Sequence, residues 1–190
     1  MATQQQDVID ILVQDHREVE EMFQELEGLR GRTGEDDRTR RKELVDRVTI
    51  ELVRHAVAEE TQVYPAVKEK VSDEEAERAK REHAEAEQTM KRLEQMDSDD
   101  PRFEAEIRTL MAEIREHVAE EEGQMFPHMR TVFSDEELVD MGRHVNAIKK
   151  MAPTRPHPGV PNDALPRLAA GPVAGLFDRL RDLASGRGKE

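Results

Sequence analysis

The sequence predicts an all-α fold: an antiparallel four-helix bundle with a short fifth helix and a proline-rich C-terminal tail. Apolar residues recur at alternating steps of three and four along four long segments, which is the period of helices packed in a bundle. Short turns separate these segments, as expected for antiparallel neighbours. The 190 residues include one Tyr, five Phe and no Trp or Cys. This composition disfavours a β-rich core and excludes disulfides and thiolate-bound metals.

The first helix is expected over residues 7–29, ending at a glycine-rich turn over residues 28–34. The second is expected from about 40 to 69. The third begins after Ser72-x-x-Glu75, a capping box in which side chains satisfy the amide N–H groups exposed at a helix start. Each of these helices therefore has its own start or stop signal.

The fourth helix follows a polar break at residues 97–100, with Pro101 expected in its first turn, where proline is tolerated. A second capping box, Ser134-x-x-Glu137, begins a shorter fifth helix that runs to about Lys150.

Composition divides the chain near residue 152. Residues 1–152 contain 39 acidic and 23 basic residues, whereas residues 153–190 contain four and six. We expect 1–152 to be the bundle domain and 153–166, with most of the chain's prolines, to be an extended linker. A short amphipathic stretch, residues 171–184, is expected to dock on the acidic body, and the alternatives are that it joins a dimer partner or lies on a membrane.

The net charge of −14 disfavours general binding to nucleic-acid phosphates. No apolar run approaches the roughly 20 residues of a membrane span, and the N-terminus lacks a signal-peptide pattern. We expect a cytoplasmic protein, a monomer or weak dimer, with no nucleic-acid partner.

Each long helix places one histidine within its apolar stripe. These four residues are His16, His55, His83 and His117. A single buried histidine is usually satisfied by a neighbouring side chain. Four in one bundle need four partners, and a metal site supplies them together, because neutral imidazole binds iron, copper, zinc and nickel. The alternative is a helical interaction protein whose histidines are only core residues.

Two of the histidines are followed one helical turn later by a glutamate that continues the apolar stripe. His55 is paired in this way with Glu59, and His117 with Glu121. A buried carboxylate without a partner is costly, so these two glutamates are candidate ligands. Oxygen and imidazole donors without a thiolate favour iron or manganese over copper(I).

The two His–Glu pairs belong to an internal repeat. Residues 55–65 and 117–127 share the pattern HxxxEExQ, an apolar residue, an aromatic residue and proline. The repeat predicts two pseudo-twofold related helices, which suits two metal ions bridged by two carboxylates. Pro65 and Pro127 each remove a helical hydrogen bond and are expected to kink the helix end beside the site or merely bend the end of the bundle.

Other polar residues near these positions are interpreted differently. Glu20 and Glu87 also follow a histidine by four residues but lie at the edge of the apolar stripe, so we interpret them mainly as solvated. Tyr64 is interpreted mainly as an aromatic plug, a role that Phe126 fills in the repeat. All three of Glu20, Glu87 and Tyr64 are also candidates for further ligands or for hydrogen-bond partners of the ligands.

The second glutamate of each HxxxEE segment is placed by helical geometry about 100° from the first around the helix axis. Glu60 and Glu122 are therefore expected mostly to face solvent, with a lesser alternative in which they steer the ligand histidines.

The dipeptide Asp15-His16, the two HxxxEE segments ending in Tyr-Pro or Phe-Pro, and His83 resemble the hemerythrin-like family, specifically its HHE cation-binding domain. The resemblance covers about residues 7–130. It implies a non-haem di-iron centre, with an oxo or hydroxo bridge, inside a four-helix bundle. The implied ligands are His16, His55, Glu59, His83, His117 and Glu121.

The resemblance further implies that Glu59 and Glu121 bridge the irons, with His16 and His55 on one iron and the other two histidines on the second. Oxygen-carrying hemerythrins have a second histidine where this chain has Glu87, and HxxxxD where it has HxxxE. The missing imidazole would leave an exchangeable position, which favours chemistry with H2O2, NO or O2 over simple reversible oxygen carriage. We therefore expect a di-iron protein that binds or reacts with one of these molecules. The alternative is a catalase-like or peroxidase-like enzyme.

Overall fold

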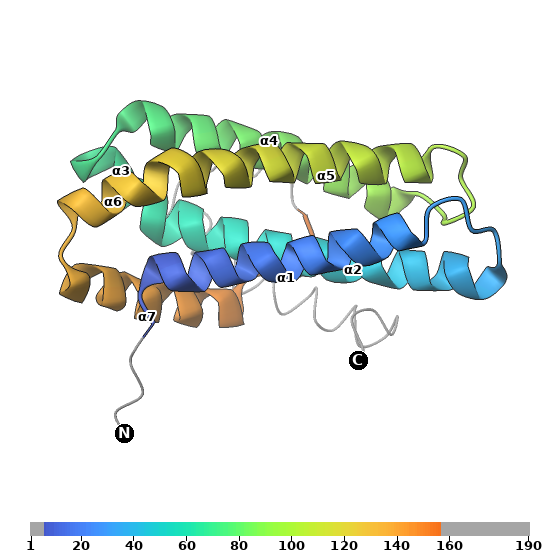
Figure 1. Ribbon diagram of the computed structural model, residues 1–190, viewed down its shortest axis with the longest axis horizontal. Coiled ribbons are helices and arrows are strands. Elements are labelled where there is room, and N and C mark those ends of the chain that lie inside the picture. Colours follow the sequence, from blue (N-terminus) through green and yellow to red (C-terminus); the bar gives the residue numbers. More distant parts are fainter. Residues whose placement is uncertain (1–5, 157–190) are drawn as a thin grey trace, which may run out of the picture.

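The computed structural model describes residues 6–156, which form an antiparallel bundle of four long helices with a further helix packed beside it (Figure 1). The long helices are α1 Val8–Gly28, α2 Glu35–Ala58, α4 Asp73–Gln95 and α5 Phe103–Glu120. No strand occurs in this part of the chain. The predicted fold class is confirmed.

Two of the long helices continue through a wider turn into a short helix. After α2 come the π-helical turn η1 Glu59–Val63 and α3 Tyr64–Lys70. After α5 come η2 Glu121–Met125 and α6 Phe126–Val132. The internal repeat in the sequence therefore corresponds to two structurally matched segments, each made of a long helix, a π-helical turn and a short helix. The fifth predicted helix is α7 Asp135–Met151.

The helix starts follow the predicted capping chemistry. The Asp7 side chain accepts the Asp10 amide at 2.9 Å before α1, and Ser72 accepts the Glu75 amide before α4. Ser134 and Glu137 form a reciprocal capping box before α7. These bonds satisfy amide donors that have no partner within the helix.

Two helix starts differ from the sequence-based expectation. Helix α2 begins at Glu35 rather than near residue 40, because three acidic residues in its first turn complement the helix dipole. This turn contains no apolar residue, so the apolar periodicity did not include it. Helix α5 begins at Phe103, after the expected position of Pro101. The Phe103 amide donates to the Asp100 carbonyl at 2.9 Å, so Pro101 lies in a turn that precedes the helix.

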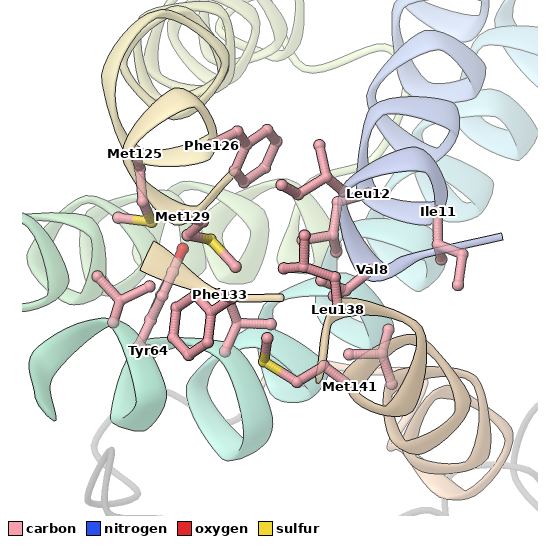
Figure 2. Close-up of a cluster of buried hydrophobic side chains, with 14 of the residues drawn as sticks. Val8, Ile11, Leu12, Tyr64, Met125, Phe126, Met129, Phe133, Leu138 and Met141 are labelled. Carbon is pink, nitrogen blue, oxygen red and sulfur yellow. The ribbon is translucent and has the colours of Figure 1, made fainter. Parts of the chain in front are cut away.

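Two apolar clusters fill the bundle and leave a polar layer between them. One joins α1, α3, α6 and α7 at one end of the bundle (Figure 2). The other joins α1, α2, α4 and α5 at the opposite end. On α1, Leu12 belongs to the first cluster and Val19 to the second, and His16 lies between them. The predicted histidines thus occupy a layer closed along the bundle axis by packed side chains.

Helix α7 packs against α1 and α2. Gly142 permits the close approach, since a Cβ there would lie 3.1 Å from the backbone of Asp7. Beyond α7, residues 152–156 are buried and Arg155 pairs with Glu94 of α4, so the start of the expected extended linker packs on the bundle. The predicted amphipathic stretch 171–184 lies outside the described residues. None of the described helices is long and apolar enough to cross a membrane.

Candidate metal centre

All six predicted ligands lie together in the polar layer between the two apolar clusters. Their exposed fractions range from 0 to 8%. The set comprises His16 from α1, His55 from α2, Glu59 from η1, His83 from α4, His117 from α5 and Glu121 from η2. Six ionisable or polar groups are therefore withdrawn from water at one place, which is costly unless they are partnered.

The imidazole rings face each other in two pairs. The Nε2 atoms of His16 and His55 are 3.3 Å apart, and those of His83 and His117 are 3.1 Å apart. Two facing ring nitrogens can share only one proton, whereas a cation can accept a lone pair from both.

The two glutamates connect the imidazole pairs. Glu59 Oε2 lies 3.0 Å from Nε2 of His55 and 3.3 Å from Nε2 of His83. Glu121 Oε2 lies 3.4 Å from Nε2 of His16 and 3.5 Å from Nε2 of His117. Each carboxylate thus touches one ring from each pair.

The layer has unused acceptor capacity. Glu59 Oε1 and Glu121 Oε2 are buried without a hydrogen-bond partner among the described residues. Such oxygens are rare in native cores unless an ion or water satisfies them. Two groups of ligand atoms are close enough to hold a cation, and Glu59 belongs to both. The donor set therefore fits metal binding.

Each ring presents its other nitrogen, Nδ1, to a carboxylate. The four pairs are His16–Glu122 at 2.9 Å, His55–Asp15 at 3.1 Å, His83–Glu60 at 3.1 Å and His117–Glu82 at 2.8 Å. Donation of Nδ1–H to a carboxylate fixes the tautomer in which the Nε2 lone pair points into the site, as is usual for metal-binding histidines.

These carboxylates follow the same pseudo-twofold pattern as the ligands. The acid that precedes the α1 or α4 histidine, Asp15 or Glu82, bonds the histidine of a neighbouring helix. The second glutamate of each HxxxEE segment bonds the remaining histidines: Glu122 bonds His16 of α1, and Glu60 bonds His83 of α4. Glu60 is almost fully buried, contrary to the solvent-facing position expected for it, whereas Glu122 remains exposed. The acid–His dipeptides Asp15-His16 and Glu82-His83 are the feature of the sequence from which this arrangement could have been predicted.

The π-helical turns explain why Tyr64 reaches the site. In a regular α-helix, five residues would place Tyr64 about 140° from Glu59 around the axis. In η1 the Tyr64 amide instead bonds the carbonyl of Glu59, five residues back, and the matched bond joins Phe126 to Glu121. The wider turn brings residue 64 round toward the ligands. Such turns are frequent at functional sites.

Tyr64 combines the expected packing role with direct contact to the site. Its ring belongs to the apolar cluster of Figure 2. Its hydroxyl lies 2.9 Å from Glu121 Oε1, 3.2 Å from Glu59 Oε2 and 3.1 Å from His83 Nε2. In the repeat, Phe126 has no hydroxyl and stacks on the His16 ring instead. This one residue pair breaks the pseudo-twofold symmetry of the site.

The other two secondary candidates, Glu20 and Glu87, belong to neither group of atoms that could hold a metal. Glu20 pairs with Arg115 on the surface, with a shortest distance of 2.8 Å. Glu87 is buried but belongs to neither group of atoms that could hold a metal. The structure thus does not bring them into the cluster.

A small cavity adjoins the imidazoles, with a volume of about 20 Å³. Aliphatic side chains on the second-cluster side of the site, including Val19, Ile114 and Val118, share its wall with all four histidines. This volume accommodates about one water-sized molecule.

Charges in the layer are balanced by protons when no metal is bound. Burial alone would lower the pKa of His55, but Glu59 and Asp15 outweigh it and raise that pKa to about 10. Burial is likewise outweighed at His83, where Glu59 and Glu60 raise the pKa to about 9. Burial would raise the pKa of Glu59, yet the two histidines hold it well below its usual range.

The metal-free protein should lose stability as the pH rises from 7 to 10. The raised pKa values of His55 and His83 contribute stability that is fully present below about 6.5, the unfolded value, and is lost as the pH passes 9 to 10. Thermal unfolding followed by circular dichroism in a chelator across this range checks it. A flat profile would show that the rings are neutral already at pH 7.

Comparison with known proteins identifies the family. The model of the hemerythrin HHE cation-binding domain matches residues 7–129, about two-thirds of the chain. The chain belongs to the hemerythrin HHE family. The matched region contains the complete cluster, so a cation-binding function of the buried His/Glu layer agrees with the family description.

Similar proteins differ in what is known of them. An uncharacterised hemerythrin-like protein of Schizosaccharomyces pombe is 28% identical over 93% of this chain and 85% of its own length. A DNA nickase of Nostoc is 24% identical over 77% of this chain but only 40% of its own length. The crystal structure of an HHE domain-containing protein from Mycobacterium kansasii has a TM-score of 0.64, with 22% identity, covering 76% of this chain and 86% of that one. It shares the fold.

Helix α7 lies beyond the matched hemerythrin region, yet it contacts Asp15, one of the carboxylates that bond the Nδ1 atoms of the histidines. Lys149 donates to Asp15, whose other carboxylate oxygen bonds the His55 ring. We predict that Lys149→Met, which keeps the aliphatic stem, weakens the affinity of the site for a metal ion by up to about tenfold, the lower end of the effect of losing a ligand's direct partner.

Competition against a chromogenic chelator measures this affinity. Arg143→Met is the matched control, because Arg143 lies on α7 and pairs with Asp140 on the same helix. Equal affinities for the two variants would show that the Lys149 contact has no influence on the site.

Proposed function

We propose that this hemerythrin-family protein holds two iron ions in the buried layer and that the centre binds or reacts with a small oxidant, O2, H2O2 or NO. The observation that carries the proposal is the pairing of four Nε2 atoms around two carboxylates that touch both pairs. His16 and His55 would hold one ion, and His83 and His117 the other. Glu59 and Glu121 would be shared.

This donor set suits iron or manganese, and we propose iron because the family resemblance implies a di-iron centre. Four imidazoles and two carboxylates, with no cysteine anywhere in the chain, combine borderline and hard donors. Bound iron would supply the one-electron chemistry that oxidants require.

The protein's own groups fit a small and reactive ligand. The carboxylates at Nδ1 hold the rings in one tautomer, and the surrounding apolar clusters exclude bulk water. The cavity of about 20 Å³ beside the histidines suits a molecule with about two non-hydrogen atoms, as O2, NO and H2O2 have, and excludes organic substrates. Burial and the neighbouring carboxylates of Glu121 and Glu59 raise the pKa of Tyr64, so its hydroxyl keeps a proton beside the site.

Anaerobic reconstitution with ferrous iron tests the proposal. The expected result is about two ions per chain, the number that these ligands support, followed by distinct optical changes with O2, H2O2 and NO. A protein that takes up no iron under these conditions would refute the metal site. An iron-loaded protein whose optical spectrum changes with none of the three molecules would refute the proposed reaction with an oxidant.

Peroxide decomposition is the second candidate function, favoured by the Tyr64 hydroxyl 2.9 Å from Glu121. Turnover of peroxide requires the reacting molecule to be oriented at the site, and this hydroxyl is a buried hydrogen-bond donor there. Oxygen evolution from H2O2 that needs bound iron and falls in Tyr64→Phe would support it. The phenyl ring preserves the packing, as Phe126 does in the repeat.

A further inference from the structure

A surface groove lies directly outside the metal layer, between α1 and α5. Its volume is about 270 Å³, and its lining includes Glu20, Arg115 and Glu122 together with His16 of the site. Glu122 is the carboxylate that bonds His16 Nδ1, so the groove floor reaches a residue already in contact with the cluster.

The groove and the small cavity share part of their walls. Four residues line both spaces: His16, Val19, Ile114 and Val118. A side chain that borders both spaces is all that separates them there. At these four residues, single side chains lie between the groove and the cavity.

Val118 differs from the other aliphatic residues of this boundary. Val19 and Ile114 are buried, with exposed fractions of 4 and 7%, and pack in the second apolar cluster. Val118 is only partly buried and packs at the edge of the same cluster. It is the most exposed of the three aliphatic boundary residues.

We propose that the α1/α5 groove is the access route to the cavity and that Val118 is its size filter. The inference rests on the proposed function, because it assigns the path of the small oxidant. Along the bundle axis the layer is closed by the two apolar clusters, so access from the side avoids opening either of them.

The chemistry of the route selects uncharged molecules. The groove rim is polar, since Arg115 is paired with Glu20 and Glu27, while the boundary itself is formed by aliphatic side chains beside His16. A charged molecule would lose its hydration at this aliphatic boundary without gaining a partner, whereas a small neutral molecule has much less hydration to lose.

Nitric oxide is the probe, because it is small and neutral and its binding to ferrous protein can be followed without turnover. Val118→Trp should slow nitric oxide association with iron-loaded protein by about tenfold or more, and Val118→Ala should accelerate it, because the barrier lies at this side chain. Ala105→Trp is the matched control, since Ala105 is exposed on the same helix and lines neither space. Its association rate should equal that of the wild type.

Iron content is measured first, which separates the two proposals. Wild-type protein without iron would refute the proposed centre. Loaded Val118→Trp protein with a wild-type rate would overturn the access route. If that variant does not fold or load, an unchanged rate in Val118→Ala overturns it instead.

A metal-free measurement completes the test. The wild-type chain has no tryptophan, so each tryptophan variant carries one reporter. In metal-free protein the reporter of Val118→Trp should be partly shielded from acrylamide, and that of Ala105→Trp fully accessible. Equal accessibility would show that residue 118 does not lie at the boundary.

Discussion

Glu59→Gln should reduce bound iron from the proposed two ions per chain to fewer than about one, the largest loss expected from a single substitution. Glu59 belongs to both groups of atoms that could hold a metal, and its Oε2 lies within 3.3 Å of a ring nitrogen in each imidazole pair. Glutamine keeps the shape but removes the negative charge that both ions would share. Loss of that charge weakens both positions together.

The measurement is iron per chain after anaerobic loading and removal of free metal. Glu43→Gln is the matched control, because Glu43 lies on α2 as well but is exposed. Circular dichroism should show that both variants remain helical, since the amide keeps the size of the side chain. Two ions per chain in Glu59→Gln would show that this carboxylate is not shared.

The sequence was sufficient to predict the fold because the helices carry their own limits and their own apolar stripes. Helix starts with a capping residue, such as Ser134 before α7, agree closely with the structure. The start of α2 was missed by about five residues, since Glu35 and its neighbours form a first turn that contains no apolar residue. Apolar periodicity cannot detect a helical turn that faces only solvent.

The six predicted ligands come together because the apolar stripes of all four long helices face the interior of the bundle. The residues that orient them were harder to predict, because Nδ1 contacts run between helices and depend on how the helices are rotated. Glu60 was expected to face solvent and is instead buried against His83. The position of Tyr64 beside Glu59 depends on a π-helical turn. Helical spacing arithmetic assumes 3.6 residues per turn and fails there.

Chelation of the iron should lower the melting temperature by about 5–10 °C at neutral pH. Metal at 100 times its dissociation constant stabilises the folded state by about 2.7 kcal/mol, and each kcal/mol corresponds to about 2–4 °C for a chain of this size. Differential scanning calorimetry of loaded and chelated protein measures the difference. A bundle whose histidines are only core residues would melt at the same temperature in both samples.

The size of this difference should increase with pH, which separates specific binding at the layer from adventitious surface metal. Without iron, protons on His55 and His83 compensate the buried carboxylates, and these protons are lost as the pH passes 9 to 10. Bound metal would replace them with a positive charge that does not titrate in this range. The chelated protein should therefore be destabilised toward pH 10 while the loaded protein is not. In Glu59→Gln, which should bind little iron, chelation should have almost no effect at any pH. A difference that persists in this variant would place the stabilising metal elsewhere on the chain.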